Sequence, residues 1–458
     1  MSTNDREAVY NARELGPAKV TVLGFQHMFA MFGSTILVPL LTGLSVSTTL
    51  LFAGLGTLLF HLVSGGSVPA FLGSSFAFLA GYAAIAPNGE AELLPYACFG
   101  VACSALLYLI LAGLIKAFGI QRVMRFFPPV VTGPIIIAIG LNLSSTAIAS
   151  CSTNWGIALV AILIVAVANI WGKGMIKIIP ILLGVIGSYL VAACVGAVDF
   201  SSVSDAAWIG LPLTWKATVF SLVGNADTSL LVTSAVTIVP IALATMIEHI
   251  GDISAISSTV GKNFIAKPGL HRTLTGDGLA TLAASLFGAP ANTTYGENTG
   301  VLSLTKVYDP MVIRLAAGLA IIFSFCPKFA AIIGAMPSAT VGGISLVLYG
   351  MISAVGIRNL IENHVDFSKS RNILIAALTL VLSIGINYSD AGAIGFSIGS
   401  VNISLSGLAI GALTGIILNA VFPGKDYVFD EGDVAAVQSE PANLADEKVK
   451  KDEENADK

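Results

Sequence analysis

Apolar runs about as long as a bilayer is thick recur along the sequence. Three of them are TVLGFQHMFAMFGSTILVPLL, WGIALVAILIVAVANIW and LSGLAIGALTGIILNAVF. A helix of about 20 such residues crosses the hydrocarbon core of a membrane. Charged residues make up 11% of the chain, whereas soluble domains have about 25%. The runs are continuous rather than alternating with a period of two, which excludes a transmembrane β-barrel and predicts an all-α polytopic membrane protein.

Fourteen transmembrane spans can be placed along the chain. They lie near 20–40, 47–65, 69–86, 95–117, 130–149, 155–171, 176–198, 230–250, 274–288, 294–308, 311–326, 329–353, 372–387 and 402–422. Lys and Arg collect on the cytoplasmic side of membrane proteins, so their positions test this count. With the N-terminus inside, every Lys and Arg before residue 424 except Lys216 and Lys328 falls on that side. We therefore expect a multi-pass protein of the cell (inner) membrane with both termini in the cytoplasm.

The spans divide into two halves of seven with opposite orientation. VPAFLGSSFAFLAG (68–81) and APANTTYGENTGV (289–301) are both small and polar, and each lies in the third span of its half. PPVVTG (128–133) and PSATVG (337–342) both read P-x-x-x-x-G and open the fifth span. Inverted repeats of this kind are common in secondary transporters. The expected fold is therefore two inverted seven-span repeats, with short extended segments breaking spans 3 and 10.

Three polar segments lie outside the spans. Residues 1–19 are expected to form a cytoplasmic N-terminal segment, and 199–229 an extracellular linker. From Gly424 onward the sequence holds 11 acids and 5 lysines. That composition predicts a solvated, disordered, acidic cytoplasmic tail at 424–458.

Several carboxylates lie within the apolar spans. Glu248 and Asp252 are one turn apart on one face of the eighth span, Glu297 lies in the tenth, and Asp277 is near the start of the ninth. Each is a candidate functional residue because a charge at membrane depth is costly. Burial and mutual repulsion favour a protonated carboxyl in the Glu248–Asp252 pair, which makes it a candidate for proton coupling. Asp277, by contrast, is expected to cap or pack a helix.

The stretch PANTTYGENTG breaks the tenth span with Pro290 and Gly296. Non-helical backbone at membrane depth survives only where protein or a water-filled cavity surrounds it. The half-helix that follows presents free N–H groups and the positive end of its dipole. We expect this stretch and SSFAF of the third span to face each other and form a donor-rich site near the midplane. The sequence has no G-x-x-x-x-G-K-[ST] motif for ATP, so transport would run on an ion gradient or passively.

Several motifs together resemble the nucleobase–ascorbate transporter family, and within it the uracil permeases. They are QHMFAMFGSTILVP, PAFLGSSFAF, EHIGD, GLHRTLTGDGLATLAASLFGAPANTTYGENTGV and MPSATVGGISLVLYG. The resemblance covers roughly residues 22–422. It implies proton-driven uptake of uracil, often by a homodimer joined through a gate domain. By analogy, 20–118 and 230–326 form a core domain, and 130–198 and 329–422 form the gate domain.

The resemblance also implies roles for individual residues. Substrate-binding roles fall to Glu248, Glu297, Phe76, Tyr295 and Gly296. Supporting roles fall to His27, Ser75 and Asn298, with His27 bracing the broken helices. The chemistry suits uracil, because carboxylates accept its N–H groups, backbone N–H groups donate to its carbonyls, and an aromatic ring covers its face. Glu248 would bind both substrate and proton, with Asp252 tuning it, and no metal or cofactor is expected.

Alternatives to uracil stay open at this point. Purine members of the family typically have glutamine at the position of Glu297, so this glutamate favours a pyrimidine. Asp252, however, stands where a familiar uracil-permease pattern has histidine and purine members have aspartate, which keeps a proton-coupled xanthine or uric acid permease possible. An anion transporter or channel of the same inverted-repeat plan is disfavoured by three nearby acids. No nucleophile–base pair or metal cluster indicates an enzyme, and the expected partners are the nucleobase, protons and lipid, not nucleic acid.

Overall fold

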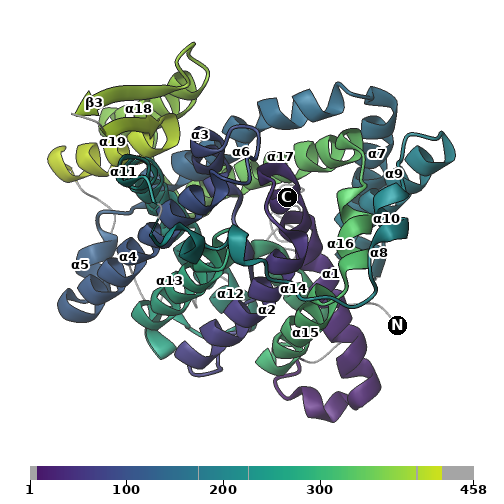
Figure 1. The fold of residues 1–458 in the computed structure, drawn as a ribbon. Helices are drawn as coiled ribbons and strands as arrows, with labels where there is room; N and C mark the ends of the chain where they lie inside the picture. Colours follow the sequence, from purple (N-terminus) through teal and green to yellow (C-terminus); the bar gives the residue numbers. More distant parts are fainter. Residues whose placement is uncertain (1–7, 174, 225, 399–400, 425–458) are drawn as a thin grey trace, which may run out of the picture.

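A computed structural model describes residues 8–173, 175–224, 226–398 and 401–424 (Figure 1). The predicted acidic tail therefore lies outside the described residues, apart from Gly424, and so do residues 1–7 of the N-terminal segment.

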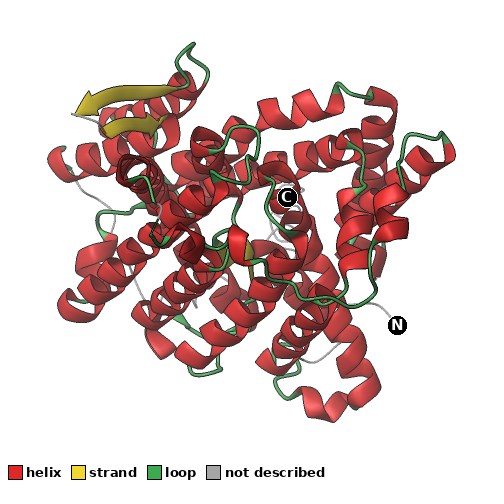
Figure 2. Ribbon diagram, viewed as in Figure 1, coloured by secondary structure: helices red, strands yellow, loops and turns green. Residues whose placement is uncertain are grey.

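Helices make up most of the described chain (Figure 2). They are α1 (Pro17–Thr42), α2 (Val46–Val63), α3 (Leu79–Ile85), α4 (Leu94–Phe118), α5 (Ile120–Met124), α6 (Pro129–Cys151), α7 (Trp155–Ile170), α8 (Met175–Ile178), α9 (Pro180–Cys194), α10 (Ser201–Asp205), α11 (Thr228–Ile238), α12 (Ala242–Val260), α13 (Leu270–Leu286), α14 (Gly296–Thr305), α15 (Pro310–Ser324), α16 (Pro327–Gly334), α17 (Ser338–Glu362), α18 (Ser370–Asn387) and α19 (Gly407–Val421).

Four short strands accompany the helices. They are β1 (Leu72–Ser74), β2 (Asn292–Thr294), β3 (Ala393–Ile398) and β4 (Val401–Ser406). β1 pairs with β2, and β3 pairs with β4, both antiparallel. A 3₁₀ turn, η3 (Phe76–Phe78), joins β1 to α3, and another, η6 (Val239–Ile241), joins α11 to α12. β1 and β2 are the extended segments that were expected in the two broken spans. The β3–β4 hairpin was not expected, so the prediction of an all-α chain is wrong there.

Several helices have the length and composition of membrane spans. Among the described residues, 7 helices are long and apolar enough to cross a membrane, or up to 8 if the bent pair α15 and α16 is one span. Proline opens many of the helices, for example α6 at Pro129, α9 at Pro180 and α15 at Pro310. At the first helical position its missing N–H would have had no partner in the helix. These helices indicate a multi-pass membrane protein.

The twelfth and fourteenth predicted spans have the wrong bounds. The chain bends by 87° between α15 and α16, and α16 ends at Gly334, so no helix runs through 329–353. The long helix here is α17, which starts after Pro337 in extended conformation. Residues 401–406 form β4, so the last helix begins at Gly407 rather than at 402. Local signals mark both places: Pro337 precedes α17, and the β4 sequence VNISLS alternates apolar and polar residues with the period of a strand.

The β3–β4 hairpin protrudes at one edge of the molecule beside α18 and α19 (Figures 1 and 2). Its register pairs Ile394 with Leu405 and Phe396 with Ile403. Ile394 and Phe396 alternate with Gly395, so both lie on one face of the hairpin. β4 also contacts α11, which connects the last two helices to the eighth predicted span.

The β1–β2 pair is buried and is hydrogen-bonded on both sides. Leu72 pairs with Thr294 and Ser74 with Asn292. The pairing continues beyond the strands, because the Ser75 N–H donates to the Ala291 carbonyl (3.0 Å) and the Tyr295 N–H donates to the Phe71 carbonyl (3.0 Å). Extended backbone within a bilayer requires such partners. The prediction that these two segments face each other is confirmed.

Each strand is also held by a threonine of the helix before it. The Thr57 hydroxyl of α2 donates to the Leu72 carbonyl (3.2 Å) and accepts from the Leu72 N–H (2.9 Å). The Thr281 hydroxyl of α13 donates to the Asn292 carbonyl (2.9 Å) and accepts from the Asn292 N–H (3.3 Å). The first residue of each strand is therefore fixed in the same way in both halves of the chain.

The helices pack in two sets. In the first set, α2 packs against α13 and α15, and α4 packs against α11 and α13. In the second set, α6 packs against α17, α18 and α19, and α7 packs against α9 and α17. The α6–α17 contact is close because Gly140 has no side chain, and a Cβ there would collide with the Tyr349 carbonyl. This contact fixes the position of α17 beside the β1–β2 pair.

Candidate functional site

The site lies where the two broken spans meet. η3 starts at Phe76 directly after β1, and α14 starts at Gly296 directly after β2. The first turn of a helix leaves N–H groups without partners inside the helix. Because β1 and β2 are antiparallel, η3 and α14 leave the strand pair at its two ends, and each presents its first N–H groups beside the pair. Such donors suit carbonyl oxygens of a ligand.

One wall of the site is formed by α12. The Thr294 hydroxyl donates to an Asp252 carboxylate oxygen (3.0 Å). A Cβ on Gly296 would lie 3.2 Å from the other Asp252 oxygen. The Asp252 carboxylate therefore lies beside the junction of β2 and α14. Glu248 is half-buried and lies one turn earlier on the same face of the helix.

A buried histidine–aspartate pair extends this wall inward. His249 Nδ1 is 3.1 Å from an Asp277 carboxylate oxygen, and both side chains are 0% exposed. The same nitrogen lies 3.3 Å from the Thr294 hydroxyl. Of the capping or packing role expected of Asp277, its place in the middle of α13 excludes capping, and its complete burial agrees with packing. Thr294 thus connects the deeply buried His249–Asp277 pair to Asp252, a link that sequence spacing gave no reason to expect.

Tyr295 contributes to the framework of the site. Its N–H is bonded to Phe71 as described above, and its phenol donates to the Ser74 carbonyl (2.9 Å). The phenol oxygen also lies 3.3 Å from the Thr35 hydroxyl of α1. Of the two residues whose backbone was expected to bind substrate, Gly296 rather than Tyr295 is therefore placed to offer an N–H.

α1 supports α14 from the other side. The Asn298 amide donates to His27 Nδ1 (3.2 Å) and to the His27 carbonyl (3.3 Å). The contact joins α1 to α14, and the bracing role of His27 stays a prediction. His27 Nε2, Asn298 Oδ1 and the Ser75 hydroxyl are buried and have no hydrogen-bond partner among the described residues. Buried polar atoms without partners are rare in proteins and point to a bound molecule.

Phe76 lies where the site meets α17. Its side chain is 7% exposed, and its ring packs edge-on against the Tyr349 ring, with centroids 5.3 Å apart and an angle of 84°. Tyr349 was not among the expected site residues, although the motif MPSATVGGISLVLYG includes it. The backbone of Glu297 lies in the first turn of α14, but its side chain lies outside the described residues. The structure thus brings Asp252 together with Thr294 and Gly296, and it places Phe76 beside Tyr349.

Comparison with known proteins identifies the family. The family described as "Permease family" matches residues 18–392. A uracil permease of Bacillus caldolyticus is 41% identical over 417 residues, which cover 88% of this chain and 92% of that protein. A putative pyrimidine permease, RutG, of Escherichia coli (strain K12) is 35% identical over 439 residues, which cover 93% of this chain and 94% of that protein.

A solved structure shares the fold. The transmembrane domain of a cyanobacterium bicarbonate transporter, BicA, superposes with a TM-score of 0.57 at 12% identity, over 90% of this chain and 99% of that domain. Identity this low supports the architecture alone. The sequence relatives carry the assignment further: the chain belongs to the permease family, the nucleobase–ascorbate transporters that its motifs resemble, and is a membrane transporter rather than an enzyme.

Proposed function

We propose that this permease imports uracil by proton symport, using the site between η3, α14 and α12. The observation that supports the proposal is the start of α14, which follows β2 and lies beside the carboxylate of Asp252 on α12. Relatives named uracil permease and pyrimidine permease, at 41% and 35% identity, support the substrate. The proposed route is alternating access at a site near the membrane midplane.

In this mechanism each part of uracil meets a complementary group. Glu248 and Glu297 accept hydrogen bonds from the two ring N–H groups, and the Gly296 N–H donates to a carbonyl. The Phe76 ring covers one face of the substrate. Glu248 takes up the coupled proton, and Asp252 tunes its charge from one turn away. Return of the empty carrier requires the proton to leave on the cytoplasmic side.

The proposed architecture is fourteen spans in two inverted seven-span repeats. The matching bonds of Thr57 to β1 and Thr281 to β2 support the repeat. In this proposal both termini lie in the cytoplasm and the chain crosses the inner membrane. The two helix sets correspond to a core domain and a gate domain, the second containing α6 and α17. α18 exposes Ile373, Leu374 and Val381, which favours a homodimer through the gate domain.

Competition experiments test the substrate. Uptake of labelled uracil into cells is expected to be blocked by excess unlabelled uracil, weakly by thymine, and hardly at all by xanthine or uric acid. Initial rates are expected to increase when the external pH falls from 8 to 6, because protons drive entry. Inhibition by xanthine or uric acid stronger than by uracil would replace the pyrimidine with a purine, and equal rates at both pH values would exclude proton coupling.

Thr294 provides a second test, because it connects Asp252 to the His249–Asp277 pair. Thr294→Val keeps the β-branched shape but removes the hydroxyl that bonds Asp252 and His249. We expect uracil uptake to fall about tenfold, as roughly 1–3 kcal/mol is lost when a buried polar group loses its partner. The matched control is Thr293→Val, since the neighbouring strand residue points to the opposite face. Equal uptake by the two variants would contradict a role for this link.

A further inference from the structure

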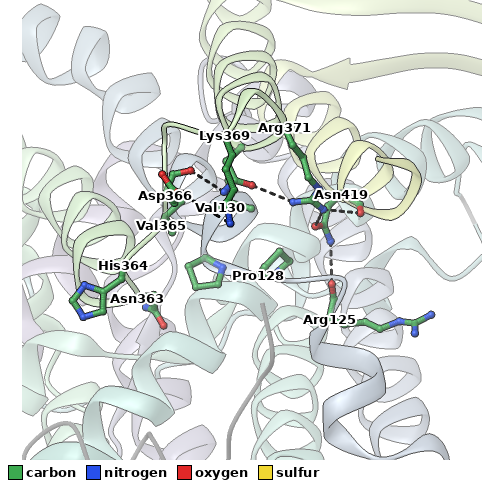
Figure 3. A pocket seen from close by; sticks show the side chains of 12 residues that line it. Arg125, Pro128, Val130, Asn363, His364, Val365, Asp366, Lys369, Arg371 and Asn419 are labelled. Carbon is green, nitrogen blue, oxygen red and sulfur yellow. Dashed lines mark hydrogen bonds and ion pairs between the residues drawn. The ribbon is translucent and has the colours of Figure 1, made fainter. Parts of the chain in front are cut away.

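A cavity of about 170 Å³ lies away from the transport site, at the end of α18 (Figure 3). Its walls are the segment 125–130 between α5 and α6, the segment 363–372 between α17 and α18, and Asn419 of α19. By the distribution of Lys and Arg, this end of the helices faces the cytoplasm. The cavity belongs to neither the site at β1 and β2 nor the contacts around it.

A hydrogen-bonded frame fixes the cavity. Arg371 Nη2 donates to the Asn419 side-chain oxygen (2.7 Å) and to its carbonyl (3.1 Å). The Asn419 amide in turn donates to the Arg125 carbonyl (3.0 Å). Figure 3 shows this chain of bonds along one wall, with the Arg125 guanidinium directed away from the cavity. These hydrogen bonds hold together the three segments that form the cavity.

The cavity is electropositive. Lys369 and Arg371 line it, and Asp366 is the acidic residue among its lining side chains. Ser368 donates its hydroxyl (2.6 Å) and N–H (2.9 Å) to the Asp366 carboxylate, which lowers the pKa of Asp366. Lys369 Nζ lies 3.9 Å from the same carboxylate, so Lys369, Arg371 and Asp366 together carry one net positive charge. α6 and α18 both begin at the cavity, and the positive ends of their dipoles add to its charge. A carboxylate-rich ligand would suit such a cavity.

The chain itself supplies such a ligand at the edge of the cavity. Gly424 is the last described residue, and a Cβ on it would lie 3.9 Å from Arg371 Cδ. Residues 425–447 follow directly and contain seven acids and one lysine. Asp430, Glu431 and Asp433 come six to nine residues after Gly424, and a chain spans at most about 3.5 Å per residue. This acidic group can therefore reach every wall of the cavity.

We propose that the acidic segment 425–447 docks in this cavity and slows transport from the cytoplasmic side. Covalent attachment gives the segment a high effective concentration there, which a free anion lacks. The slowing rests on the proposed function: the wall 125–130 connects the helix set of α4 to that of α6, and these sets must move relative to each other in alternating access. A docked segment holds that connection against α18.

Proteolysis of the intact chain tests docking without any substrate. Chymotrypsin cleaves after Tyr427 and Phe429, which lie in the proposed docked segment. In nanodiscs of neutral lipid at low salt, we expect Lys369→Glu to speed cleavage at these sites about fivefold, as an exposed ion pair is lost. Neutralising the acidic group by Asp430→Asn, Glu431→Gln and Asp433→Asn should have the same effect, as should 0.5 M salt.

The matched control is Lys173→Glu, which reverses an exposed positive charge elsewhere on the predicted cytoplasmic face. It should be cleaved like the wild type. Equal cleavage of all variants would overturn docking. So would a Lys369-dependent binding of anionic lipid with no change in cleavage, because the cavity would then hold a lipid headgroup.

Uptake measurements test the regulatory consequence separately. The neutralised variant should take up uracil about two- to fivefold faster than the wild type at the same expression level. Protection from chymotrypsin with unchanged uptake would confirm docking and overturn the slowing of transport. Loss of uptake in every variant and in the wild type would count against the proposed substrate and leave the cleavage result standing.

Discussion

Glu248→Gln is expected to abolish accumulation of uracil against its gradient. Glutamine preserves the size of the side chain and one acceptor oxygen, but it neither carries a negative charge nor takes up a proton. Glu248 is half-buried on the face of α12 that Asp252 shares, next to the β1–β2 site. We expect proton-driven uptake to fall at least about 100-fold, since a hydrogen bond to a charged group and the coupling are lost together. The measurement is uptake into membrane vesicles with an imposed pH gradient, with and without a protonophore.

Two further variants separate coupling from binding. Glu362→Gln changes an exposed carboxylate that pairs with Arg358 on α17, and it should leave uptake unchanged. Asp252→Asn should lower uptake and shift its pH dependence without abolishing it, if Asp252 tunes Glu248. If the Glu248→Gln protein still responds fully to external pH, the proton carrier lies elsewhere. The buried Asp277 would then be the next candidate, because His249 and Thr294 connect it to the site.

The membrane class and the pairing of the two broken spans could be predicted from the sequence. Apolar runs and the distribution of Lys and Arg are local properties, so they indicate helices and their orientation without knowledge of packing. Pro290 and Gly296 marked the broken tenth span because helix interiors do not tolerate them. Their pairing with the segment after Pro69 followed from the repeat, and β1–β2 confirms it.

The β3–β4 hairpin and the bend at α16 could not be predicted in the same way. At the bend the chain stays largely apolar while the backbone changes direction. In β4, VNISLS does alternate apolar and polar residues as a strand does, but the pattern is only six residues long and leads directly into an apolar helix. Cys326 and Pro327 end α15 and start α16, but a proline inside a predicted span is also compatible with a kink. What fixes these elements is contact with distant segments, such as β4 with α11.

The hydrogen-bonded polar residues of the site could be predicted only in part, because some of them meet through tertiary contacts. Spacing along the helix put Glu248 and Asp252 on one face, which needs only the helical period. The same rule says nothing about Asp277, which reaches His249 because α13 packs beside α12. Tyr295 differs from Asp277, because the sequence did single it out. Its place in a specific motif suggested substrate binding, whereas its phenol and N–H hold the strand pair together.

Glu297→Gln is expected to reduce uracil uptake severely, through a change of donors and acceptors rather than of shape. The residue lies in the first turn of α14, directly after Gly296, where backbone N–H groups already donate toward the site. A carboxylate adds acceptors for a ring N–H, whereas an amide presents an NH₂ donor as well. Losing a hydrogen bond to a charged group costs about 1.5–3 kcal/mol, so we expect roughly 10- to 100-fold lower uptake at low uracil concentration.

The amide of the introduced glutamine also determines which results would contradict this prediction. Glutamine is typical of this position in purine members of the family, so labelled xanthine should be tried with the variant beside uracil. A severe loss of uracil uptake, with Glu297→Asp retaining more activity than Glu297→Gln, would show that the negative charge binds the pyrimidine. Wild-type uracil uptake by Glu297→Gln would remove this residue from the site, and the half-buried Glu248 and Asp252 on α12 would then have to supply every carboxylate contact to the ring.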